Sequence, residues 1–185
     1  PDVNMATITG SVVAGRRVAE ICGSQVKRVA LELGGKSAAI VCEDADLATV
    51  VPGLAAASVI NSGQACAAQT RILIPESRYE EYLSALADAY QAMKLGDPAE
   101  PDTQLGPMIH ERHFNRVKEC IAMGVSEGAR IVTGGCTPSH LEPGYFIEPT
   151  LLADVNNNMR VAREEIFGPV VCAIPYKDEE DAIRI

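Results

Sequence analysis

The fold is organised around one stretch, Asn61-Ser62-Gly63-Gln64-Ala65-Cys66-Ala67-Ala68-Gln69-Thr70-Arg71, a polar break between an apolar helical segment and a short strand at residues 72–74. The break places one cysteine, Cys66, directly after a Gly-Gln-Ala sequence. Free cysteine is only about 3% thiolate at pH 7, so a catalytic cysteine needs a base, a helix N-terminus or a cation nearby. Cys66 is therefore either an activated nucleophile or one more buried small hydrophobe, and spacing alone does not decide between them.

A carboxylate upstream is the candidate base for this cysteine. Glu32 lies in Val29-Ala30-Leu31-Glu32-Leu33-Gly34-Gly35-Lys36, at the end of an apolar run. We expect Glu32 to be largely buried, where desolvation makes a carboxylate a stronger base toward water. The alternative interpretation is an ordinary surface charge at the end of a strand.

Composition limits the class of protein and its partners. With 185 residues, of which 47% are hydrophobic, the chain can bury a sizeable core. A net charge of −9 argues against nucleic acid and against an anionic membrane surface, because both would repel it. The apolar runs fall far short of the roughly 20 residues of a membrane span, and no N-terminal signal pattern is present. We therefore expect a cytoplasmic protein without a membrane or nucleic-acid partner.

The cysteines and histidines indicate no metal centre. Six cysteines lie at wide, irregular intervals without a Cys-x-x-Cys pair, so we expect reduced thiols. His110 and His113 are three residues apart in a helical stretch, but they have no cysteine or carboxylate partner at ligand spacing. We predict no metal site and interpret both histidines as surface or core side chains.

The alternation of strand and helix patterns predicts an α/β fold with a mainly parallel sheet. A strand ending near residue 8 leads through Thr9-Gly10-Ser11 into a helix, which Ser11 can cap. Gly10 allows a phosphate to approach the helix start, although an ordinary cap explains the same residues. Further elements are expected as strands at 26–33, 37–42, 72–74 and 130–132, an extended segment at 146–152, and helices at 75–93 and 111–127.

Another helix is expected from the Asp44-Ala45-Asp46 sequence onward. Pro52 should interrupt this helix and restart it, because proline is best tolerated in a first turn. The stretch 54–60 is apolar all round, so we expect it to be buried and to carry Cys66 into the interior. In the helix at 75–93, the apolar spacing predicts a core face formed by Tyr79, Tyr82, Leu83, Leu86, Ala89, Tyr90 and Met93.

A second polar site is expected near Glu164-Glu165-Ile166-Phe167-Gly168-Pro169-Val170. A carboxylate can accept two hydrogen bonds from a ribose diol, and an aromatic ring beside it can pack on a nicotinamide. Glu165 is therefore a functional candidate. On the pattern alone, a solvated helix end is the commoner explanation of two adjacent glutamates.

Three segments, in this order, resemble the signature segments of the NAD(P)-dependent aldehyde dehydrogenase superfamily. They are Leu31-Glu32-Leu33-Gly34-Gly35-Lys36-Ser37, Gly63-Gln64-Ala65-Cys66 and Glu164-Glu165-Ile166-Phe167-Gly168-Pro169-Val170. The resemblance implies an aldehyde-dehydrogenase-like α/β fold that is truncated at both ends, because the chain is less than half the family's length. Residues 1–33 would be the C-terminal part of a nucleotide-binding domain, and residues 34–185 an incomplete catalytic domain.

The resemblance also implies a mechanism, a cofactor and partners. Cys66 would add to an aldehyde, the thiohemiacetal would give hydride to NAD(P)+, and Glu32 would activate the water that releases a carboxylic acid. The family's cofactor contacts carry over to Gly10, Ser11, Gly15, Leu33, Gly34, Glu165 and Phe167, with Glu165 on the nicotinamide ribose. A homo-oligomer is implied, whereas the aldehyde and the choice between NAD and NADP stay open.

Three other functions stay open. A cofactor-independent thioester hydrolase or acyltransferase could use a Cys/Glu pair, but it has no need for Glu165-Ile166-Phe167. A phosphorylating or acylating dehydrogenase would generally lack the base at Glu32. The third alternative is a non-catalytic fragment or association domain, and we expect the 185 residues alone to be inactive.

Overall fold

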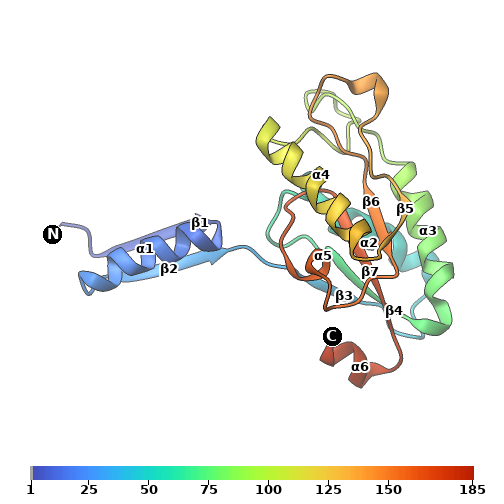
Figure 1. Cartoon of the computed structure of the whole chain (residues 1–185), viewed down its shortest axis with the longest axis horizontal. Coiled ribbons are helices and arrows are strands. Elements are labelled where there is room, and N and C mark those ends of the chain that lie inside the picture. Colours follow the sequence, from blue (N-terminus) through green and yellow to red (C-terminus); the bar gives the residue numbers. More distant parts are fainter. Residues whose placement is uncertain (1) are drawn as a thin grey trace. The chain divides into compact units, whose positions relative to one another are not determined.

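The structure is a computed structural model that describes residues 2–185, and the chain divides into two compact units, Pro1–Gly35 and Lys36–Ile185. The division falls beside the Gly34-Gly35 pair, close to the domain boundary that the family resemblance implies. That the two units are parts of a cofactor domain and a catalytic domain stays a prediction. Each unit is described by itself below (Figure 1).

The first unit is a strand, helix, strand motif. Strand β1 (Met5–Gly10) is joined by helix α1 (Val12–Ser24) to β2 (Arg28–Leu33), and the strands pair in parallel. Helix α1 begins at Val12 because the Ser11 side chain accepts a hydrogen bond from the backbone N–H of Ala14 at 3.2 Å. The predicted cap is therefore confirmed.

The second unit contains a five-stranded sheet. Its strands are β3 (Ala38–Ile40), β4 (Arg71–Pro75), β5 (Arg130–Thr133), β6 (Thr150–Ala153) and β7 (Val170–Tyr176). The spatial order is β3-β4-β7-β6-β5, and every pair is parallel except β5 with β6. The predicted α/β fold with a mainly parallel sheet is thus confirmed.

Helices cover both faces of this sheet (Figure 1). They are α2 (Leu47–Ser58), α3 (Tyr79–Gln91), α4 (Glu111–Ser126), α5 (Arg160–Arg163) and α6 (Glu179–Arg184), with single-turn 3-10 helices at Ile60–Gly63, Glu76–Arg78 and Ser139–Leu141. Successive side chains of a strand point to opposite faces, so each central strand contributes side chains to two hydrophobic cores, one on each face of the sheet. Cys172 of β7 packs with α4 and α5, whereas its neighbours Val171 and Ala173 pack with α2 and α3.

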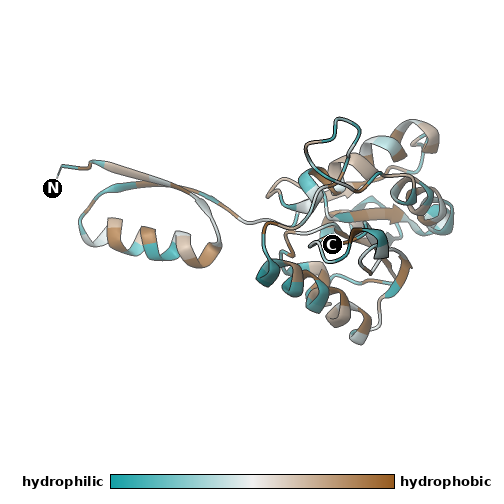
Figure 2. Cartoon of the chain, turned by 90° about the horizontal axis from the view of Figure 1, so that it is seen from above, coloured by the Kyte–Doolittle hydropathy of each residue, from teal (hydrophilic) through white to brown (hydrophobic). Residues whose placement is uncertain are grey.

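Helices α3 and α4 show the amphipathic pattern that this packing requires. In Figure 2, apolar and polar residues follow one another along the helices. Tyr79, Tyr82, Leu83, Leu86 and Tyr90 of α3 are buried, as predicted. Burial raises the pKa of the Tyr79 phenol to about 12, and its hydroxyl donates to the carbonyl of Ala173 at 3.0 Å. Among residues 2–185, no helix is long and apolar enough to cross a membrane.

Two expectations for α2 are wrong. The helix is not interrupted at Pro52 but runs unbroken from Leu47 to Ser58, with its N-terminus capped by Asp46. Pro52 lies on the exposed side of the helix, where a carbonyl that loses its donor can be hydrated. The stretch 54–60 is also only partly buried, since Ile60 is 55% exposed.

Candidate active site

The turn that carries Cys66 has a left-handed backbone. After α2 ends, Asn61, Ser62 and Gly63 adopt φ angles of 53°, 56° and 71°. The turn is held by its own polar groups: the Asn61 amide donates to the Gln64 carbonyl at 3.1 Å, and the Ser62 hydroxyl donates to the Gly106 carbonyl at 2.9 Å. Such a conformation is disfavoured for residues with a Cβ, so the surrounding contacts must hold it.

The turn brings Cys66 to the surface and not into the interior. Cys66 is exposed, and the prediction that helix 54–60 would bury it is wrong. The reason is that the left-handed turn redirects the chain before Cys66 is reached, and it is Ser62 and Gly63 that are buried instead. Among the described residues, the backbone N–H of Cys66 donates no hydrogen bond.

Three of the other five cysteines are poorer nucleophiles than an exposed, unpaired thiol. Cys120 and Cys172 are buried, and burial raises the pKa of both thiols. Cys136 is exposed, but its thiol donates to a carboxylate oxygen of Glu148 at 3.0 Å, and this bond raises its pKa. All six cysteines are free thiols in the structure.

The segment around Phe167 lies against the turn that carries Cys66. An ideal Cβ built on Gly63 would lie 2.1 Å from the carbonyl oxygen of Gly168, so the two backbones are in direct contact. Gly168 in turn lies against Val117 of α4. The structure therefore brings together two segments that the sequence identifies separately, one holding Cys66 and the other holding Glu165 and Phe167.

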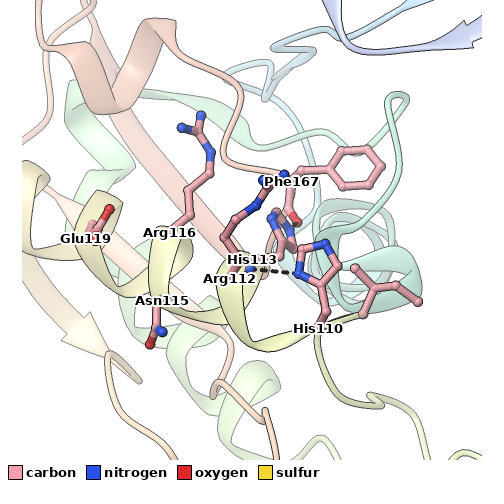
Figure 3. A pocket seen from close by; sticks show the side chains of 8 residues that line it. His110, Arg112, His113, Asn115, Arg116, Glu119 and Phe167 are labelled. Carbon is pink, nitrogen blue, oxygen red and sulfur yellow. Dashed lines mark hydrogen bonds between the residues drawn. The ribbon is translucent and has the colours of Figure 1, made fainter.

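Two residues of α4 that belong to none of the predicted site segments contact the segment of Glu165 and Phe167 (Figure 3). His113 Nε2 lies 2.6 Å from the Phe167 carbonyl oxygen, and the two rings meet edge-on with centroids 6.0 Å apart. Arg116 donates to the Glu165 carbonyl at 3.1 Å. His110 instead caps α4, because its Nδ1 accepts from the backbone N–H of His113 at 3.0 Å.

Phe167 is placed between two clefts. The residue is 39% exposed and its φ is +59°, an uncommon value for a residue other than glycine. One cleft, of about 650 Å³, runs along the first turns of α4 past His113 and Arg116. The other, of about 620 Å³, runs past Asn61 and Gln64 in the Cys66 turn. Both volumes are in the range of small-molecule sites, and each cleft has an aromatic wall.

The remaining predicted site residues belong to the first unit. Glu32 is exposed on β2, so the prediction of burial is wrong. Leu33 packs against α1, and because strand side chains alternate between faces, Glu32 points to the face that α1 does not cover. Gly34 follows at the end of the unit.

Gly15 has a packing role that the sequence does not reveal. An ideal Cβ at this position would lie 2.5 Å from the Leu33 Cδ2 atom, so glycine lets α1 approach β2 closely. At Gly10, by contrast, a Cβ would meet nothing closer than 3.9 Å, so packing does not require glycine there. Ser11 is exposed and its hydroxyl serves the helix cap. Among residues 2–185, no three His, Cys, Asp or Glu side chains gather as metal ligands would.

Comparison with known proteins connects this arrangement to a family. The model of the aldehyde dehydrogenase family matches residues 1–185. Geranial dehydrogenase of Castellaniella defragrans is 48% identical over 185 residues, and 3-succinoylsemialdehyde-pyridine dehydrogenase of a Pseudomonas species is 45% identical over 186. These matches cover all of this chain but only 38% and 39% of the two relatives, so the chain spans well under half of their length.

Solved structures agree with the sequence matches. An aldehyde dehydrogenase of Mycobacterium tuberculosis in complex with NAD+ is 50% identical, with a TM-score of 0.97, over 100% of this chain and 38% of that one. A mutant of aldehyde dehydrogenase C from Pseudomonas syringae, in complex with NAD+ and octanal, is 42% identical, with a TM-score of 0.96, over 99% and 38%. Sequence and fold thus agree over the entire chain, which belongs to the aldehyde dehydrogenase family.

Proposed function

We propose that the protein containing this chain oxidises an aldehyde to a carboxylic acid with NAD or NADP, through a covalent intermediate on Cys66. One observation carries the proposal: the exposed Cys66 follows a left-handed turn that is packed, through Gly63 and Gly168, against the segment of Glu165 and Phe167. An exposed thiol can reach a substrate, and a fixed turn holds it in one orientation.

The first step is addition of the Cys66 thiolate to the aldehyde carbonyl carbon. A carbon–sulfur bond forms, and the carbonyl oxygen becomes an oxyanion. The free backbone N–H of Cys66 supports this step, because a donor already in place can stabilise that charge without reorganisation. Oxidation of the thiohemiacetal then leaves a thioester on Cys66.

Glu32 takes the second role, as the base that activates water. Its carboxylate accepts a proton from water, the hydroxide attacks the thioester carbon, and the carbon–sulfur bond breaks to release the acid and the Cys66 thiolate. Exposure of Glu32 leaves the carboxylate accessible to water. Hydrolysis to the free acid is what distinguishes this proposal from an acyl-transferring dehydrogenase.

The fit of a nicotinamide cofactor can be judged from the second unit. Phe167 offers a part-exposed ring beside clefts of about 650 and 620 Å³, and the half-buried Glu165 stands two residues before it. A ring and a carboxylate suit a nicotinamide and its ribose. A bound nicotinamide would supply the hydride acceptor for oxidation of the thiohemiacetal. The residues that would hold the cofactor are Gly10, Ser11, Gly15, Leu33, Gly34, Glu165 and Phe167.

We assign residues 1–33 to the end of a nucleotide-binding domain and residues 34–185 to the catalytic domain. The solved neighbours in complex with NAD+ support a nicotinamide cofactor for this chain. A homo-oligomer in the cytoplasm is part of the same proposal. Because the chain spans only 38% of those neighbours, we expect residues 1–185 alone to show no aldehyde oxidation.

Substitution of cysteine in the intact protein tests the proposal. Cys66→Ser should lower NAD(P)+-dependent oxidation of a panel of aldehydes by at least roughly 10³-fold, because a serine hydroxyl is far less acidic than a thiol and stays un-ionised at neutral pH. Cys42→Ser is the matched control, since Cys42 is also exposed but lies outside the turn. Activity that survives in Cys66→Ser and disappears in Cys42→Ser would refute the assignment. Thioester hydrolysis without any nicotinamide requirement would favour a hydrolase instead.

A further inference from the structure

Two side chains of α4 hold the backbone that carries Glu165 and Phe167. His113 Nε2 lies 2.6 Å from the Phe167 carbonyl oxygen, and Arg116 Nη2 lies 3.1 Å from the Glu165 carbonyl oxygen. Because His113 and Arg116 are three residues apart, they lie on the same face of the helix. Figure 3 shows both side chains rising from α4, with His113 beside Phe167. One rigid helix therefore holds both carbonyls that flank Ile166.

The hydrophobic core also fixes the segment of Glu165 and Phe167, through the residue between them. Ile166 is 2% exposed and packs in one cluster with Val117 of α4. A Cβ on Gly168 would lie 2.6 Å from the Val117 Cγ2 atom, so the helix and the segment are in close contact there as well. The backbone of the segment is thus held on both sides, while Phe167 as a residue remains 39% exposed.

Phe167 needs such support because of its backbone conformation. A φ of +59° is disfavoured for a residue with a Cβ, and it persists only where the surroundings impose it. The carbonyl oxygen of Phe167 can only accept, so the 2.6 Å contact requires a proton on His113 Nε2. Both the neutral Nε2–H tautomer and the imidazolium meet this requirement.

We propose that His113 and Arg116 are positioning residues, which fix the backbone of Glu165–Phe167 and thereby aim the Glu165 carboxylate and the Phe167 ring at the cofactor. The role toward a cofactor rests on the proposed function. The claim that His113 and Arg116 hold this backbone does not rest on the proposed function, and it can be tested by itself.

The first test uses the absence of tryptophan from the sequence. Phe167→Trp makes a single fluorescent reporter, which can be combined with His113→Ala, His113→Gln, Arg116→Ala or Arg116→Lys in residues 1–185. The alanine substitutions should raise the acrylamide quenching constant at least about twofold and lower the anisotropy, because the ring gains mobility. Gln and Lys retain a donor and should restore most of both values.

Lys118→Ala is the control for this reporter. It removes one positive charge from α4, and Lys118 is exposed and does not line either cleft beside Phe167. The control should leave quenching and anisotropy unchanged. Equal values in His113→Ala, Arg116→Ala and the unsubstituted reporter would overturn the proposal.

The second test measures the consequence in the intact protein. His113→Ala and Arg116→Ala should each raise the KM for the nicotinamide cofactor about 3- to 20-fold, with a smaller change in kcat, and Gln or Lys should restore it. A merely structural role predicts lower thermal stability with an unchanged KM, and that result would overturn the positioning role. If the reporter responds but the unsubstituted protein binds no nicotinamide, the hold on the backbone stands and the proposed function fails.

Discussion

Gly63 and Gly168 touch through their backbones, with an ideal Cβ on Gly63 only 2.1 Å from the Gly168 carbonyl oxygen. No side chain could fit at position 63 without moving the segment that holds Glu165 and Phe167. The φ of +71° at Gly63 excludes a side chain on conformational grounds as well. A single contact between two glycines thus couples the turn of the candidate nucleophile to the candidate cofactor segment.

Gly63→Ala should therefore destabilise the second unit by roughly 2–5 kcal/mol, from backbone strain and from the clash with Gly168. Urea unfolding of residues 1–185, followed by circular dichroism, measures the change. Gly53→Ala is the matched control, because a Cβ at this exposed helical position meets nothing within 4 Å. The control should gain about 0.5–1 kcal/mol. Equal stabilities for the two variants would show that the backbone contact is absent in solution.

Thiol labelling should separate the cysteines by exposure and by pKa. At pH 7 we expect iodoacetamide to modify Cys66 and Cys42 at least about tenfold faster than Cys120 and Cys172, whose pKa values are raised by burial. Peptide mass spectrometry after short exposures gives the individual rates. Preferential labelling of Cys120 or Cys172 would contradict the burial described here.

Cys136 offers an internal control for that experiment. Its hydrogen bond to Glu148 raises the thiol pKa, so it should react more slowly than its exposure alone suggests. Glu148→Gln removes the carboxylate and should speed the labelling of Cys136 without affecting that of Cys66. An unchanged Cys136 rate would mean that the hydrogen bond does not control its reactivity.

Much of the fold follows from local patterns in the sequence. The apolar spacing of α3 and the cap at Ser11 are visible in a few residues, and both are confirmed. Strand β7 is not among the predicted elements, although it lies between β4 and β6 in the middle of the sheet. It is buried on both faces, so its apolar run has no alternation, and such a run does not distinguish a strand from a helical segment.

The site could be predicted only where its signal is local. Cys66, Glu165 and Phe167 stand in short, recognisable segments, whereas His113 meets Phe167 across 54 residues and gives no sign of it in the sequence. The exposure of Cys66 could not be foreseen either, because it depends on three successive positive φ angles, two of them at Asn61 and Ser62. Propensity gives little warning of such a conformation in residues other than glycine.

Lys36 should make stability depend on pH. Its ammonium nitrogen is buried without a hydrogen-bond partner among the described residues, and desolvation lowers its pKa below the usual 10.5. In the window between the lowered pKa and 10.5, the unfolded chain binds more protons than the folded chain, so stability rises with pH across it. Below that window, the full cost of the buried charge is present.

Lys36→Met should accordingly stabilise residues 1–185 at pH 7, and the gain should shrink as the pH rises toward 10.5. Urea unfolding of both proteins at pH 7 and pH 10 measures this difference, and Lys177→Met at an exposed position controls for the loss of one charge. A stabilisation that grows with pH would show that Lys36 is not buried as a charged group.

The most direct test of the central claim is to trap the intermediate on Cys66. In the intact Glu32→Gln protein, loss of the base should slow thioester hydrolysis by roughly 10²- to 10⁴-fold while aldehyde addition continues. A burst of reduced nicotinamide should precede slow turnover, and peptide mass spectrometry after an acid quench should find the acyl group on the peptide that contains Cys66. Steady-state turnover at the unsubstituted rate, with no acyl group on Cys66, would contradict the account.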